Sequence, residues 1–69
     1  MSDFTNIINK AAKTKYVKIL RIKEPRPGMA GSVVVASAEQ AESLAIVLAA
    51  SDIPAQYSSY RGTDFVFVG

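Results

Sequence analysis

The residues Ser32-Val33-Val34-Val35-Ala36-Ser37-Ala38-Glu39-Gln40 contain an expected change from strand to helix, around which the other elements can be arranged. The first five residues are apolar on both faces and rich in valine, which predicts a short strand in a central position. Ser37 followed three residues later by Gln40 is typical of a capping box, in which each side chain bonds the other residue's backbone N–H. A strand running directly into a helix is therefore predicted here.

The predicted helix runs to about residue 50, before the chain is interrupted by Pro54. Its core stripe repeats at helical spacing and is widened by two further apolar side chains; the stripe is Ala41, Leu44, Ala45 and Leu48, and the additions are Ile46 and Val47. The final turns are almost wholly apolar. We expect this helix to be either deeply buried or part of an interface.

Upstream, Phe4, Ile7, Ile8 and Ala11 form the apolar stripe of a helix over residues 3–12, with Ser2 as its N-cap. Residues 15–23 read as a strand whose apolar residues change parity, so either a bulge near Ile19–Leu20 switches the faces or both faces are partly covered. Residues 24–31 contain two prolines and two glycines and are predicted to form a loop.

Downstream, residues 55–60 and 65–68 read as two strands joined by a turn over 61–64, which predicts a hairpin. The order is then α-β-β-α-β-β. Residues 1–69 are expected to form one small α+β domain: a four-stranded, mainly antiparallel sheet with helices on one face.

The amino-acid composition narrows the classes of function that the chain can perform. The 69 residues are 49% hydrophobic and 20% charged, and they include no Cys and no His. Neither disulfides nor thiolate or imidazole chemistry is available, so we expect no catalytic residues, no metal site, no cofactor and no enzymatic activity. The central charge-free run, residues 43–51, has about half the length of a membrane span, so no membrane association is expected. Together with an N-terminus unlike a signal peptide, this predicts a cytoplasmic protein.

Charge is distributed unevenly along the chain. Residues 1–28 carry seven Lys or Arg and two carboxylates, whereas residues 29–69 carry one Arg and four carboxylates. A basic segment over residues 10–26 favours an acidic protein partner or nucleic acid. The same lysines could equally protect an edge strand and meet only solvent.

The last predicted hairpin contains two tyrosines beside an arginine, and Tyr and Arg are enriched at binding hot spots. One tyrosine packing in the sheet and the other covering an edge would also explain them. We interpret the chain as a non-enzymatic module that binds a larger protein with an acidic patch, a profile shared by type with small phage or plasmid inhibitors. The candidate contact residues are Lys15, Lys18, Arg21, Lys23, Arg26, Tyr57, Tyr60 and Arg61.

Two alternatives remain, a nucleic-acid-binding protein and a structural or assembly subunit. Residues 61–68 resemble the RNP1 octapeptide of the RRM family at Arg61, Gly62, Phe65 and Val66, but non-aromatic residues stand at two of its aromatic positions. Residues 28–31 have the GXXG pattern of KH domains, although they lie between predicted strands rather than helices. Neither likeness assigns the chain to a family.

Self-association is expected because a domain of this length buries only about 60% of its unfolded surface. The uncharged run Phe65-Val66-Phe67-Val68 is the candidate segment, since an edge strand of this composition pairs readily with another chain. If residues 65–68 form an edge strand, the sequence predicts a homodimer that pairs through them; a well-packed monomer is the alternative, because many domains this short fold alone.

Overall fold

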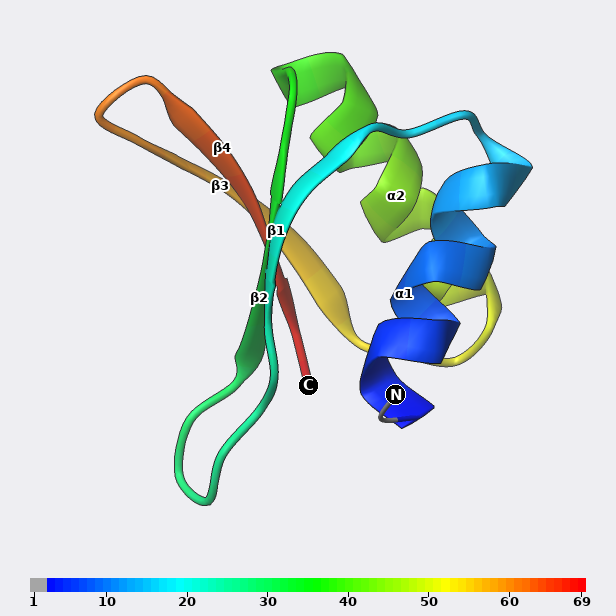
Figure 1. Ribbon diagram of the computed structural model, residues 1–69, viewed down its shortest axis with the longest axis vertical. Coiled ribbons are helices and arrows are strands. Elements are labelled where there is room, and N and C mark those ends of the chain that lie inside the picture. The colour runs from blue at the N-terminus through cyan, green and yellow to red at the C-terminus, as the bar shows by residue number, and fades with distance from the viewer. Residues whose placement is uncertain (1–2) are drawn as a thin grey trace.

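The computed structural model describes residues 3–69 and has six elements around one antiparallel sheet. In chain order they are α1 (Asp3–Thr14), β1 (Ile19–Lys23), β2 (Gly31–Val35), α2 (Ala38–Ala50), β3 (Ala55–Tyr60) and β4 (Thr63–Val68). The strands lie in the order β1-β2-β4-β3, and each neighbouring pair is antiparallel. Both helices cover the same face of the sheet (Figure 1). The predicted α+β fold and element order are confirmed.

The core lies between the two helices and the two central strands. It contains Val33 and Val35 of β2, Val66 and Val68 of β4, and the buried side of each helix: Ile8, Ala11, Ala12, Ala41, Leu44 and Leu48. The apolar stripes predicted for the two helices include residues that the structure leaves exposed. Ile7 is 44% exposed and Ile46 is 67% exposed, because each helix packs on the sheet along a face narrower than its apolar surface.

The predicted strand over 15–23 begins only at Ile19. The connection before it follows the end of α1, where the Val17 N–H donates to the Ala12 carbonyl (2.9 Å) and Tyr16 has a left-handed φ of 56°. The pairing of β1 with β2 then shifts register between Ile19 and Arg21. The bulge is thus confirmed; Ile19 and Ile22 pack against the core, and Leu20 is left 57% exposed.

The predicted position of residues 65–68 at a sheet edge is wrong. β4 pairs with β2 on one side and with β3 on the other, so its backbone is not available to another chain. The strand is also longer than predicted because the turn is tighter. Arg61 and Gly62 have φ of 50° and 74°, which fits a two-residue type I′ turn between Tyr60 and Thr63.

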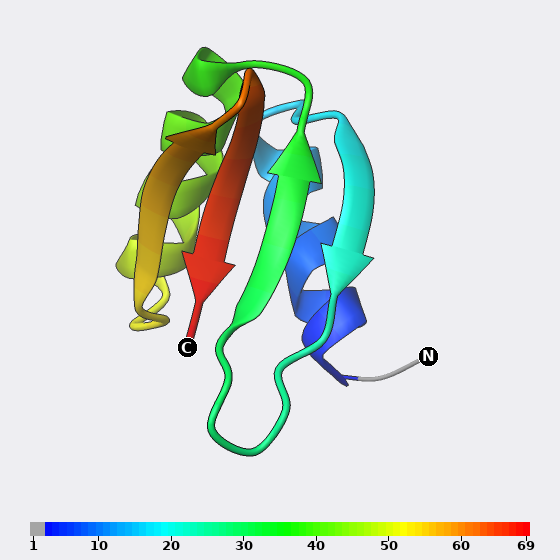
Figure 2. The same cartoon turned by 90° about the vertical axis from the view of Figure 1, so that its left-hand side faces the viewer.

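The helix termini and the first loop agree broadly with the sequence. Ser37 caps α2 as predicted, since its Oγ accepts a hydrogen bond from the Gln40 N–H (3.3 Å). The Ser2 cap proposed for α1 lies outside the described residues. The loop between β1 and β2 is closed by the pairing of Arg26 with Met29 and extends beyond the end of the sheet (Figure 2).

Candidate functional site

One face of the sheet is covered by neither helix, and Figure 2 looks directly onto it. We call it the open face. Strand alternation and register place on it Leu20, Arg21 and Lys23 of β1, Ser32 and Val34 of β2, Gln56, Ser58 and Tyr60 of β3, and Thr63, Phe65 and Phe67 of β4. Within the described chain, no carboxylate belongs to these strand positions, so the face combines apolar and cationic groups.

Four of these side chains, Leu20, Val34, Phe65 and Phe67, form what we call the apolar strip. Val34 is directly opposite Phe65 in the β2–β4 register, and Leu20 lines the same shallow hollow as both. The rings of Phe65 and Phe67 stack on each other, with centroids 5.9 Å apart and planes inclined by 17°. Phe67 is 43% exposed. These apolar side chains gathered on an uncovered face make the strip the candidate contact surface of the molecule.

The bulge in β1 explains why the strip reaches this far across the sheet. In a regular strand, the consecutive residues Leu20 and Arg21 would point to opposite faces of the sheet. Because the bulge inserts Leu20 as an extra residue, both side chains line the hollow on the open face. Arg21 and Lys23 share a strand parity and lie opposite Val34 and Ser32. The open face therefore has cations along its β1 side, next to the apolar strip.

The basic segment is divided by the sheet. Lys10, Lys13 and Lys18 line a groove between α1 and the connection to β1, together with the 91% exposed Tyr16. Lys15 is exposed in that same connection, and Arg26 belongs to the loop beyond the sheet. Only Arg21 and Lys23 are on the open face, so the predicted basic residues do not form one continuous surface.

The predicted cluster of Tyr57, Tyr60 and Arg61 is divided as well. Tyr60 is on the open face, 63% exposed, and the Arg61 guanidinium lies 5.3 Å from the centre of its ring. Tyr57 is on the helix side, where its hydroxyl donates to Asp64 Oδ1 at 3.0 Å. This bond to the carboxylate, together with desolvation, raises the pKa of Tyr57 above its ordinary value. Tyr57 thus stabilises the hairpin, while Tyr60 is available to a partner.

Leu20 and Val34 were not among the predicted contact residues. Val34 could have been identified from the alternation of Val33, Val34 and Val35, because a strand covered on one face presents its middle residue to the other. Leu20 required the bulge to be placed. Phe65 and Phe67 were chosen for edge pairing, whereas the structure exposes them through the face of a central strand.

Over residues 3–69, no three His, Cys, Asp or Glu side chains are grouped so that they could hold a metal ion. Neither described helix has the length and apolar character needed to cross a membrane. Comparisons with protein-family models, curated proteins and solved structures gave no significant match.

Proposed function

We propose that the chain is a non-enzymatic binding module that docks on a larger protein through its open face. The observation that carries this proposal is the apolar strip on an uncovered sheet, with Arg21 and Lys23 beside it. The strip supplies apolar anchors, and the cations steer association toward a partner with carboxylates around an apolar patch. A module of this kind alters its partner by occupying a surface, which is how a small inhibitor acts.

Three features favour protein over single-stranded nucleic acid. A nucleic-acid platform needs free aromatic ring faces beside a continuous track of cations. On the open face Phe65 and Phe67 stack on each other, and Arg61 covers one face of the Tyr60 ring. Lys10, Lys13 and Lys18 lie on the helix side. The other two side chains of the apolar strip, Leu20 and Val34, are aliphatic, and aliphatic side chains do not stack on nucleic-acid bases as aromatic rings do.

The test compares two pairs of matched variants in capture from native lysate, followed by affinity measurements with the captured protein. Phe67→Ala truncates the strip, and Ile7→Ala truncates an equally exposed residue on α1. Arg21→Glu reverses a cation of the open face, and Lys13→Glu reverses one on the helix side. We expect the open-face variants to weaken binding by at least about fivefold and the α1 variants to leave it unchanged.

Nuclease treatment separates the two classes of partner. A near-stoichiometric protein that survives nuclease and is lost with Phe67→Ala supports the proposal. Bands that disappear with nuclease, together with affinity that falls steeply with salt and depends on Lys13, would contradict it and favour nucleic acid.

A further inference from the structure

A second candidate surface lies at the outer edge of β3. The two edges of the sheet differ in their protection against pairing with another strand. The β1 edge has a bulge at Leu20 and charges at Arg21 and Lys23 within the strand, and a proline lies close to each edge strand, Pro25 after β1 and Pro54 before β3. β3 pairs with β4 in regular register over all six residues, and its sequence Ala55-Gln56-Tyr57-Ser58-Ser59-Tyr60 contains no charge and no proline. Natural edge strands normally carry such protection, so the β3 edge is suited to accept a strand.

The hairpin register shows which groups β3 offers. Tyr60 and Thr63 close a two-residue turn and therefore form a hydrogen-bonded pair. At the other end, the Gly69 N–H donates to the Pro54 carbonyl at 3.0 Å, which fits the same alternation. It follows that the backbone groups of Ala55, Tyr57 and Ser59 are directed away from β4, toward the free edge.

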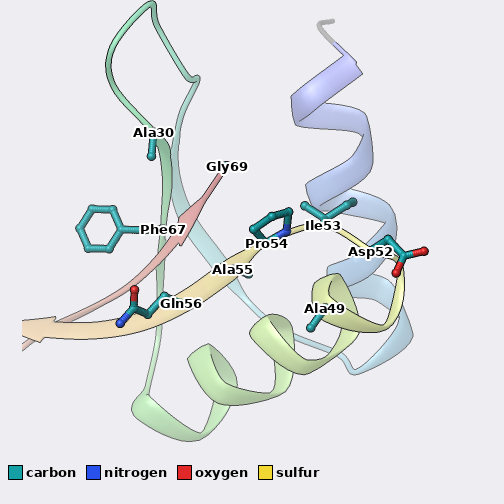
Figure 3. Close-up of a pocket in the computed structure, with 9 residues that line it drawn as sticks. All are labelled: Ala30, Ala49, Asp52, Ile53, Pro54, Ala55, Gln56, Phe67 and Gly69. Carbon is teal, nitrogen blue, oxygen red and sulfur yellow. The ribbon is translucent and has the colours of Figure 1, made fainter.

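The helix behind this edge is apolar as well. In Figure 2, α2 extends sideways past β3, whereas α1 lies behind the other half of the sheet. Ala49 of α2 lines a hollow at the end of the sheet, which the start of β3 shares with Ala30, Phe67 and Gly69 (Figure 3). One turn earlier along α2, Ile46 is 67% exposed. The helix behind the β3 edge therefore presents exposed apolar side chains together with the exposed Glu42.

The charges at the two ends of β3 are opposite. Asp52 lies just before the strand, beside the hollow, and Arg61 follows directly after it (Figure 3 shows Asp52). Arg61 is the one cation among residues 29–69. If two β3 strands pair antiparallel about a two-fold axis, the Arg61 end of each copy meets the Asp52 end of the other. A second copy of the same chain supplies this complementary pattern at both ends at once.

We propose that the chain forms a two-fold symmetric dimer through antiparallel pairing of β3 with β3 of a second copy, giving one continuous sheet of eight strands. The same symmetry sets the two α2 helices antiparallel, so Glu42 of one copy lies beside the uncharged C-terminal half of the other rather than beside its own equivalent.

Sedimentation equilibrium of the full chain over a range of concentrations tests the proposal, which does not require binding through the open face. We expect a mass of twice 7.4 kDa at high concentration. Ser59→Lys adds a charge to the β3 edge and should give the monomer mass, whereas Leu20→Lys, a lysine on the other edge strand, should leave the dimer intact. A monomer at every concentration, or a dimer insensitive to Ser59→Lys, would overturn the proposal.

Two further measurements do not depend on how well Ser59→Lys folds. Arg61→Glu and Asp52→Lys should each weaken the dimer by about tenfold at low salt, and the double variant should restore it. Amide hydrogen exchange in the unmodified chain should show Tyr57 and Ser59 gaining protection as concentration rises. Single variants without effect, absence of rescue, or equally fast exchange of both amides at all concentrations would each contradict pairing through β3.

Discussion

The backbone N–H of Lys18 donates a hydrogen bond of 2.7 Å to the side-chain Oε1 of Gln40, 22 residues later in the chain. Gln40 lies in the first turn of α2, and Lys18 immediately precedes β1. The bond joins the beginning of the edge strand to the beginning of the helix that covers the opposite half of the sheet. The Gln40 side chain therefore fixes a long-range contact instead of bonding the Ser37 backbone.

Replacing Gln40 by Ala should lower the free energy of unfolding by about 1 kcal/mol, because the Lys18 N–H loses its acceptor. Gln40→Glu keeps an oxygen at this position and puts a carboxylate near the helix N-terminus, so it should retain most of the stability. Urea unfolding followed by circular dichroism checks both. Equal losses for the two variants would show that the hydrogen bond does not contribute.

The Gln40 contact illustrates where the sequence was sufficient and where it was not. Local signals located α2 and β3 to within a residue, since the Ser37 cap, the apolar stripe and Pro54 all act over a few positions. Gln40 occupies the expected place in a capping pattern, but its actual partner is brought near only by the tertiary fold. No spacing within the helix indicates Lys18.

The candidate surface was harder to predict because it depends on strand order. If β4 were the last strand of the sheet, Phe65 and Phe67 would lie on an edge strand. In the observed order β1-β2-β4-β3 the same two residues lie on a central strand that is covered on one face only. The apolar ending of α2 had a similar ambiguity. Leu48 turned inward and Ile46 outward, a choice that follows from where the sheet and α1 lie rather than from the helix itself.

Two leucines provide a matched test of the core. Leu44 is fully buried and Leu20 is 57% exposed on the open face. Leu44→Ala leaves a cavity between α2 and the sheet and should cost about 2–5 kcal/mol, whereas Leu20→Ala should change stability by less than about 0.5 kcal/mol. Urea titrations at one fixed protein concentration measure both, since dimerisation would add to apparent stability. Similar costs would contradict the described packing.

The hydrogen bond between Tyr57 and Asp64 predicts a dependence on alkaline pH. The folded state raises the pKa of Tyr57 above 10.0, so the native protein holds this proton more tightly than the unfolded chain does. The resulting stabilisation is complete below about pH 10 and is lost as pH rises through the folded-state pKa. Unfolding free energies of the wild type and Tyr57→Phe should differ by a constant amount at neutral pH and converge at alkaline pH. A difference that does not change with pH would show that the bond contributes no linkage.

Close packing of α1 on the start of β2 gives a final prediction. A Cβ at Gly31 would lie 2.6 Å from Cζ of Phe4 and 3.0 Å from Cδ of Pro25, so Gly31→Ala must displace the Phe4 ring. We expect this substitution to cost about 1–3 kcal/mol. In a Phe4→Ala background the main obstacle is gone, and the same change should cost about 1 kcal/mol less, a coupling that a double-mutant cycle in urea measures directly. Additive effects would mean that Phe4 does not fill the space above Gly31, and that α1 is held against the sheet by Ile8 and its neighbours alone.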